Sequence, residues 1–299
     1  MTRLNGSTAR FLMCRPEHFA VNYTINPWMD PKRWARDADA HAAAEREWQA
    51  LYRKLLKLGA AVELVPPRPG LPDLVFTANA AVVLDGKALL ARFRHPERQR
   101  EEGYFEAAFR SLQARGLIDS VRKLPKDLVL EGAGDCVWDA RRKLFWAGYG
   151  PRSDTSAAHA VEEMFGQDVV ALELADPRFY HMDTALAPLP GGEVMYLPRA
   201  FTAAGKAAIR ERVAADERIE IAIEDGCRLA ANAVALGNTL IMSSCGRRLR
   251  AQLGARGYAV VTTPLSSFLR SGGSAFCLTL RLDRRSVPLS TVEPQVAVA

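Results

Sequence analysis

Cys277 stands in the setting of this sequence that best suits nucleophilic chemistry. It follows the run Ser271-Gly272-Gly273-Ser274, where glycine permits close backbone approach and unusual dihedral angles. A cysteine acts as a nucleophile only as its thiolate, which a neighbouring positive charge stabilises. The competing interpretation is a small hydrophobic residue that packs in the core. The residues around Cys277 leave both interpretations open.

A histidine and nearby acids supply groups that such a nucleophile needs. His181 and Asp183 stand two residues apart, and residues two apart on a strand point to the same face. We therefore expect the imidazole and the carboxylate to lie together. Glu131 and Asp135 flank a short glycine-containing run. On the alternative interpretation, His181 is a structural histidine and the two acids lie in a solvated turn.

Similar polar residues recur where predicted hairpins begin. The segment around Asn79 resembles the segment around Asn232, and each leads into an apolar run, a turn and a second apolar run. Asp135 and Asp183 stand before two further hairpins of the same kind. A structural unit that is used several times, each copy with an inward polar group, predicts one shared centre.

A helical stretch and a closing apolar run follow each hairpin. The predicted helices are Trp34 to Leu58, Glu97 to Arg115, Asp154 to Phe165, Thr202 to Ala215 and Gly246 to Arg256. The predicted closing strands are Ala61 to Val65, Val121 to Leu124, Val169 to Leu174, Ile219 to Ile223 and Ala259 to Thr262. The chain thus consists of five ββαβ units. The first has a weak opening hairpin around Phe11 to Cys14, and the last strand runs from Cys277 to Leu282.

Composition is that of an ordinary globular protein with a substantial core, since 48% of the 299 residues are hydrophobic and 25% are charged. The sequence has no linker or low-complexity break, so we expect one domain over residues 1–299. The first fifteen residues lack an apolar signal core and no apolar run reaches membrane-spanning length, which predicts a cytoplasmic protein without a membrane partner. The net charge of +6 is scattered over helices, which disfavours nucleic-acid binding. Homo-oligomer formation stays open.

Five cysteines, at positions 14, 136, 227, 245 and 277, are odd in number and widely spaced. This spacing predicts reduced thiols instead of a disulfide framework. No C-x-x-C pair indicates a zinc site.

An ordered set of segments between Asn22 and Leu282 resembles the guanidino-group-modifying enzyme superfamily. The matching segments are Asp73 to Asn79, Arg92 to Arg98, Glu131 to Asp135, Gly148 to Arg152, His181 to Thr184 and Gly272 to Cys277. In motif the chain is most similar to bacterial arginine dihydrolases and dimethylargininase-like proteins. The resemblance implies a pseudo-fivefold α/β propeller, the pentein fold, and a small arginine-like guanidino substrate.

The resemblance also implies a role for each candidate residue. Cys277 matches the nucleophile, His181 the general acid/base, and Glu131 the acid that orients the imidazole. Asp135 could exchange roles with Glu131, because this chain has one residue more than the family's E-G-G-D pattern. Asp183 is implied to hold the guanidinium, and Arg98 and Arg152 the α-carboxylate, with Arg92 and Arg94 as alternatives to Arg98. Asn22 and Asn26 are implied to belong to a loop that closes over the substrate. The remaining implied contacts are Phe76 and Asn79.

The implied reaction requires these residue types. A guanidinium carbon is a poor electrophile, so it needs a strong nucleophile and flanking anions. By the resemblance, Cys277 attacks this carbon and His181 protonates the departing amine. Water that His181 activates then hydrolyses the S-alkylthiouronium. We expect neither a metal nor an organic cofactor.

Asn79 stands where deiminases and dimethylargininases carry an aspartate. An amide can donate to the carbonyl oxygen of a ureido product, which a carboxylate would repel. The simpler interpretation is a hairpin-start residue suited to turn geometry. Together with the resemblance, Asn79 predicts an arginine dihydrolase that forms ornithine, ammonia and carbon dioxide. The alternatives are a dimethylargininase or arginine deiminase that forms citrulline and, with less support, an amidinotransferase or a non-catalytic guanidino binder.

Overall fold

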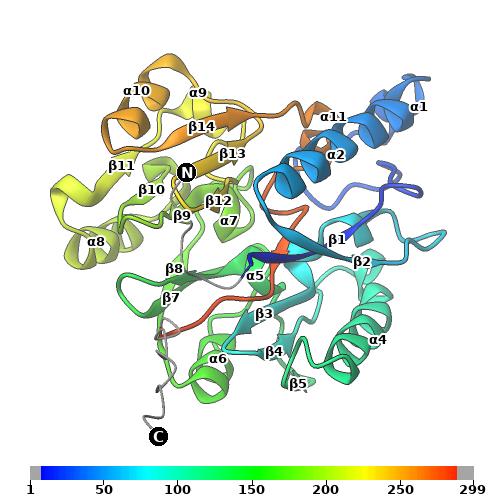
Figure 1. The fold of residues 1–299 in the computed structure, drawn as a ribbon, viewed down its shortest axis with the longest axis horizontal. Helices are drawn as coiled ribbons and strands as arrows, with labels where there is room; N and C mark the ends of the chain where they lie inside the picture. Colours follow the sequence, from blue (N-terminus) through cyan, green and yellow to red (C-terminus); the bar gives the residue numbers. More distant parts are fainter. Residues whose placement is uncertain (1–7, 288–299) are drawn as a thin grey trace, which may run out of the picture.

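Three-stranded sheets form the inner part of the molecule, and the longer helices lie around their outside (Figure 1). The computed structural model describes residues 8–287. Residues 1–7 and 288–299 of the predicted domain lie outside this range, so its full extent stays a prediction. No helix within residues 8–287 is both long and apolar enough to span a membrane.

The second unit shows how each sheet is built. Strands β3 (Ala81–Leu84) and β4 (Lys87–Leu90) form a hairpin, and β5 (Ser120–Lys123) pairs with β4 in parallel. The hairpin turn is Asp85-Gly86, whose φ angles are 52° and 72°. Both angles are positive, as a two-residue type I′ turn requires, and Asp-Gly is a preferred pair for that turn.

Between β4 and β5 the chain forms α3 (Pro96–Gln99) and α4 (Glu101–Ala114). Phe105, Phe109 and Leu112 of α4 are buried against the sheet. Their spacing of four and three residues places them on one helix face. The hydrophobic pattern therefore determines which side of α4 packs inward.

The third, fourth and fifth units repeat this order of elements. Their strands and long helices are β6 (Cys136–Asp139), β7 (Leu144–Tyr149), α6 (Ala157–Phe165), β8 (Asp168–Glu173), β9 (Leu186–Pro188), β10 (Val194–Tyr196), α8 (Ala203–Arg212), β11 (Arg218–Glu220), β12 (Val234–Leu236), β13 (Thr239–Met242), α10 (Arg247–Ala255) and β14 (Ala259–Thr262). In every unit the hairpin is antiparallel and the closing strand is parallel. The predicted fold of ββαβ units is confirmed.

Two predicted helices are interrupted. The helix predicted from Trp34 is divided into α1 (Pro31–Ala35) and α2 (Ala40–Lys57), and the one predicted from Glu97 into α3 and α4. Between α1 and α2, the carboxylate of Asp37 accepts a hydrogen bond from the backbone of Asp39 at 3.2 Å. Such local side-chain bonds compete with helix formation.

The first sheet is completed by both ends of the chain. β1 (Arg10–Cys14) pairs in parallel with β2 (Ala61–Val65) and, on its other side, antiparallel with β15 (Leu280–Arg281). The expected opening hairpin near β1 was therefore wrong, because its partner strand comes from the far end of the sequence. The expected last strand was also too long: Cys277 lies in a turn before β15.

The segments before the hairpins form short helical turns instead of strand starts. Asn79 lies in the 3₁₀ turn Thr77–Ala80, Asp135 ends α5 (Gly132–Asp135), and Asp183 lies in α7 (Met182–Ala185). The expectation of one strand face for His181 and Asp183 was wrong, since His181 is extended and Asp183 is already helical. Figure 1 shows α5 and α7 towards the middle of the molecule. The further short helices are α9 (Ile223–Gly226) and α11 (Ser266–Leu269).

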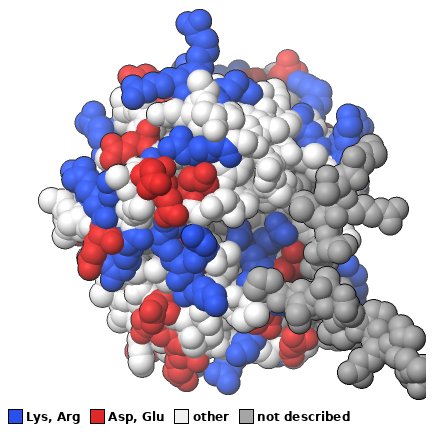
Figure 2. Space-filling view, turned by 60° about the vertical axis from the view of Figure 1, so that its left-hand side comes forward, with Lys and Arg blue, Asp and Glu red and all other residues white. Residues whose placement is uncertain are grey.

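Charged side chains are mixed on the surface. On the face in Figure 2, Lys and Arg groups alternate with Asp and Glu groups instead of forming one large basic patch.

Candidate active site

The polar groups of the helical turns are buried at the centre. Nearly all predicted site residues have exposed fractions of 4% or less, namely Phe76, Asn79, Arg98, Glu131, Asp135, Arg152, His181, Asp183 and Cys277. Burial at this level means that each polar group must find a partner inside the protein or in a ligand.

Glu131 is bound directly to His181. The imidazole Nε2 lies 2.8 Å from Glu131 Oε2, and Arg152 Nη1 donates to the same oxygen at 2.9 Å. The backbone N–H of Arg94 donates to Oε1 at 3.2 Å. Burial acts to raise the pKa of Glu131, but Arg152 and His181 outweigh it and hold this pKa well below its usual range. Glu131 is therefore a stable anion beside the imidazole.

Asp135 is the more distant of the two acids. Its Oδ2 lies 3.9 Å from His181 Nε2 and accepts a hydrogen bond from Ser153 Oγ at 2.6 Å. Its Oδ1 accepts from the backbone N–H of Met182 at 3.0 Å. Burial raises the pKa of Asp135 to about 6. The geometry thus favours Glu131 as the partner of the histidine. Asp135 instead caps the first residue of α7 through its bond to the N–H of Met182.

Cys277 lies between an acid and an amide. Its Sγ–H donates to Asp183 Oδ2 at 3.2 Å, and Asn232 Nδ2 donates to the sulfur at 3.0 Å. Burial first, and then Asp183, raise the pKa of the Cys277 thiol well above its usual value. Burial also raises the pKa of Asp183 to about 7. No cation is among the groups that set this pKa, so the thiol is protonated.

Asp183 has one oxygen to spare. Among residues 8–287, its Oδ1 is one of the few buried side-chain atoms that have no hydrogen-bond partner. A buried carboxylate oxygen of this kind is suited to an N–H donor of a ligand. The site therefore offers a free hydrogen-bond acceptor, Asp183 Oδ1, to a cationic or amide-like group.

Asn79 is held in one orientation by its neighbours. Arg98 Nη1 donates to Asn79 Oδ1 at 2.9 Å, and Asn79 Nδ2 donates to the carbonyl of Glu131 at 3.3 Å. Gly134 makes room for the amide, because a Cβ there would lie 2.1 Å from Nδ2. Because Arg98 can only donate, the amide atom that it contacts is the oxygen, and the NH₂ group of Asn79 faces the carbonyl of Glu131.

Arg98 and Arg152 are both buried beside acids. Arg98 Nε and Nη2 bind Glu101 at 3.0 Å and 2.8 Å, and Arg152 Nη2 donates to the carbonyl of Ile25 at 3.1 Å. Of the alternatives to Arg98, Arg94 is exposed and ion-paired with Asp154. The position of Arg98 next to Asn79 favours it over that alternative.

The loop between β1 and α1, residues 15–30, is hydrogen-bonded to the segments that precede Cys277 and His181. Asn26 Nδ2 donates to the carbonyl of Ser271 at 3.0 Å, and Trp28 Nε1 donates to the carbonyl of Arg178 at 2.6 Å. The ring of Phe76 packs against the backbone of Gly273, since a Cβ there would approach the ring to 2.3 Å. Asn22 is exposed, so the structure does not bring it to the buried cluster.

The predicted site residues omitted Asn232. The sequence did show Asn232 at a position equivalent to Asn79, and that equivalence was the available signal. Its contact with Cys277 could not be derived from the sequence, because 45 residues separate the two.

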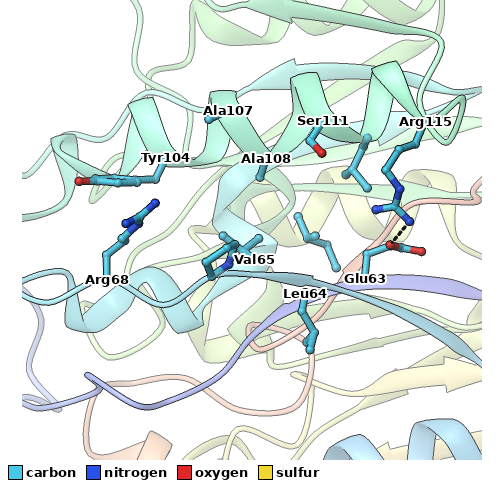
Figure 3. Close-up of a pocket in the computed structure, with 12 residues that line it drawn as sticks. Glu63, Leu64, Val65, Arg68, Tyr104, Ala107, Ala108, Ser111 and Arg115 are labelled. Atoms are coloured by element: carbon cyan, nitrogen blue, oxygen red, sulfur yellow. Dashed lines mark hydrogen bonds and ion pairs between the residues drawn. The ribbon is translucent and has the colours of Figure 1, made fainter.

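A separate groove of about 310 Å³ lies between α4 and β2 (Figure 3). Tyr104 and Arg68 stand near one end, and the ion pair of Arg115 with Glu63 at the other. Its lining includes none of the predicted site residues, so it is distinct from the buried cluster.

Residues 15–284 match the family described as eukaryotic N,N dimethylarginine dimethylhydrolase. The bifunctional arginine dihydrolase/ornithine cyclodeaminase AgrE of Nostoc sp. is 44% identical over 92% of this chain and 38% of its own length. The N(G),N(G)-dimethylarginine dimethylaminohydrolase of Mycobacterium tuberculosis is 37% identical over 94% of this chain and 88% of its own.

A solved structure shows the same fold. It is the N-terminal domain of the cyanobacterial arginine dihydrolase ArgZ, a cysteine-to-serine mutant bound to substrate. This domain is 40% identical, with a TM-score of 0.87 over 93% of this chain and all of that one. The chain spans 38% of the length of the bifunctional relatives AgrE and ArgZ. The expected pentein fold and superfamily are confirmed: the chain belongs to the dimethylarginine dimethylaminohydrolase family of guanidino-modifying enzymes.

Proposed function

We propose that this protein is an arginine dihydrolase, which hydrolyses the guanidino group of arginine twice. The observation that carries the proposal is the buried amide of Asn79, held beside the Glu131–His181 pair where citrulline-forming relatives are expected to carry a carboxylate. The names of AgrE and ArgZ, which include arginine dihydrolase, support the same reaction.

In the first hydrolysis, arginine supplies the positive charge that Asp183 and Cys277 lack among the groups that set their pKa values. Its guanidinium binds the free Oδ1 of Asp183 and favours ionisation of Cys277, whose proton passes to His181. The sulfur forms a bond to the guanidinium carbon, and His181 returns the proton to the departing nitrogen, which leaves as ammonia. Water then attacks, loses a proton to His181 and breaks the carbon–sulfur bond, so that citrulline and the thiolate remain.

The second hydrolysis repeats these steps on the ureido group. An NH₂ hydrogen of Asn79 donates to the ureido oxygen and keeps citrulline in the site. Attack by Cys277 releases a second ammonia, and hydrolysis of the thioester-like adduct leaves a carbamate of ornithine. The carbamate loses carbon dioxide. Arginine and two waters therefore become ornithine, two ammonia and one carbon dioxide.

Other residues serve binding. We assign Arg98 and Arg152 to the substrate α-carboxylate, Glu131 and Asp183 to the guanidinium, and the β1–α1 loop to closure of the site. A catalytic thiolate needs a reducing compartment, so we also propose a cytoplasmic location, which cell fractionation tests.

A second candidate is a single hydrolysis of a methylated arginine to citrulline and an alkylamine. It is favoured by the match to the dimethylarginine family and by the relative from Mycobacterium tuberculosis, which this chain covers almost fully. It makes no use of the amide at Asn79.

Product analysis distinguishes the two functions. The purified protein is incubated separately with arginine, methylarginines, citrulline, agmatine and succinylarginine, with the Cys277→Ser variant as a control. We expect arginine to yield ornithine with two ammonia for each, and the control to be inactive. Citrulline in stoichiometric amount without ornithine would contradict double hydrolysis, and turnover of methylarginine alone would establish the second candidate.

A further inference from the structure

Asn232 connects the nucleophile to the acid beside it. Its Oδ1 accepts a hydrogen bond from the backbone N–H of Cys277 at 3.1 Å, and its Nδ2 donates to Cys277 Sγ at 3.0 Å. The same Nδ2 donates to the backbone carbonyl of Asp183 at 3.2 Å. Asn232 is completely buried, so these protein groups provide the partners of its amide.

The backbone before Asn232 is shaped to aim this side chain inward. Leu229 adopts a positive φ of 52°, which is uncommon for a residue other than glycine, asparagine or aspartate. Its carbonyl accepts the backbone N–H of Asn232 at 3.0 Å. The carbonyl of Asn232 in turn accepts the N–H of Phe276 at 3.3 Å. The two turns are thus joined through both backbone and side chain.

We propose that Asn232 is a positioning residue of the reaction, which fixes the Cys277 turn and stabilises the thiolate by donating an N–H to its sulfur. This inference rests on the proposed role of Cys277 as the nucleophile. The side chain of Asn232 is bonded to Cys277 and to the backbone of Asp183, and we assign its effect to Cys277.

The charges around the sulfur explain why this donor is needed. Asp183 accepts the hydrogen bond of the Cys277 thiol, and Tyr180 is a second titratable group near the sulfur. Burial and Asp183 raise the pKa of the thiol, whereas Asn232 and a backbone hydrogen bond from Ser274 lower it. Without the amide of Asn232, the sulfur would keep its acidic neighbour and lose its side-chain donor. The thiolate would then form only at higher pH.

The first test measures the rate of Cys277 alkylation by iodoacetamide against pH, with the labelled peptide quantified by mass spectrometry. Alkylation forms a carbon–sulfur bond, releases iodide and transfers the thiol proton to buffer, so it requires no guanidino substrate. Asn232→Ala removes the donor, and Asn232→Leu keeps about the same size, removes the donor and adds no charge. We expect both to move the inflection of the rate upward by about one to two pH units, because hydrogen bonds to charged groups have that strength.

The matched control is Asn238→Ala, at an exposed position in the hairpin turn of the same unit. It should leave the inflection unchanged. If Asn232→Ala does not fold, Asn232→Leu carries the test alone. An inflection equal to that of the unchanged protein in a folded Asn232 variant would overturn the proposal, even if arginine turnover is as proposed above.

A second measurement separates positioning of the thiolate from a general effect on the pocket. Arginine binding is measured by calorimetry in Cys277→Ser and in the same background with Asn232→Ala. If Asn232 acts through the sulfur, the two affinities agree within about twofold. In the protein that retains Cys277, Asn232→Ala then lowers kcat by at least about tenfold. A loss of arginine affinity of tenfold or more in the serine background would show that Asn232 shapes the pocket instead, and would overturn the proposal.

Discussion

The buried carboxylates of the site differ in charge because their neighbours differ. Glu131 touches the cation Arg152 and stays ionised, whereas no positive charge is among the causes that set the pKa of Asp183 at about 7. Asp135 lies between these two, with a pKa of about 6. Carboxylates with such different pKa values take different roles. Glu131 is suited to stay ionised and hydrogen-bonded to His181, whereas Asp183 is suited to ionise when a cationic substrate binds beside it.

The charge of Asp183 should appear in the pH profile of arginine hydrolysis. Below pH 7 this carboxyl is protonated in the unliganded protein and cannot pair with a guanidinium. We therefore expect kcat/KM to rise as the pH rises towards about 7 and this contribution to level off above it. Asp183→Asn should lack this inflection and lower kcat/KM by about a hundredfold or more.

Asp168→Asn is the control for that profile, because Asp168 is exposed at the start of β8. It should reproduce the unchanged inflection. The assignment to Asp183 fails if Asp183→Asn retains the inflection near pH 7.

Asn79→Asp should change the products more than the binding of arginine. The aspartate can still accept from Arg98, but it has no N–H for the oxygen of a ureido group. We expect citrulline to leave before the second hydrolysis, so that the ratio of citrulline to ornithine rises at least about tenfold. Chromatography of the products from arginine measures this ratio. The same ratio in both proteins would remove Asn79 from the explanation of double hydrolysis.

At the scale of elements, short helical turns hold most of the candidate site residues, and one loop is bonded to the segments beside them. The β1–α1 loop is fastened by Asn26 and Trp28 to segments that flank His181 and Cys277. Because the site residues are buried and this loop is bonded to both segments, we expect the proposed substrate to enter when the loop opens.

Asn26→Ala should shift this loop towards its open form. The variant loses the hydrogen bond to the carbonyl of Ser271, which contributes about 1 kcal/mol, or roughly a fivefold change in population. It also loses the bond that the backbone N–H of Trp28 donates to Asn26 Oδ1 at 2.9 Å, but that bond lies within the loop. Alkylation of Cys277 at fixed pH should become roughly fivefold faster in the unliganded protein. Thr24→Ala is the control, since its hydroxyl donates to Met29 within the same loop. Equal alkylation rates for Asn26→Ala and the unchanged protein would mean that this bond does not hold the site closed.

Across the whole molecule, the turns form a closed ring. Hydrogen bonds join each turn to the next, from Ala78 N to Cys277 O, Asn79 Nδ2 to Glu131 O, Met182 N to Asp135 Oδ1, Asn232 Nδ2 to Asp183 O and Phe276 N to Asn232 O. β15, which follows the Cys277 turn, pairs with β1 and so joins this turn to the first sheet. Arg10 also donates its backbone N–H to Asp283 at 2.7 Å.

Leu280→Ala should therefore reduce global stability. Leu280 is 2% exposed in β15 and packs in the core of the second unit. Its truncation leaves a cavity and should lower the free energy of unfolding by about 2–4 kcal/mol. Val287→Ala, at a residue that is 66% exposed, should change it by less than about 0.5 kcal/mol. Urea denaturation measures both, and similar effects of the two variants would show that β15 is not needed to close the ring.

The sequence by itself determined the repeating unit and the types of group in the site. Periodicity within a few residues reports which face of a helix or strand is buried, and it located β2 and β14 to the residue. The recurrent polar residues before the hairpins indicated one centre, and the ordered motifs indicated guanidino chemistry. These features are local, so they can be found without knowledge of the partners.

Only the tertiary structure decided how these groups meet. The pairing of β15 with β1, the contact of Glu131 instead of Asp135 with His181, and the bond of Asn232 to Cys277 join residues far apart in the sequence. Each depends on closure of the ring, which no local pattern encodes. The charges depend on it as well, because burial and neighbouring ions set each pKa, and both arise only when the turns are brought together.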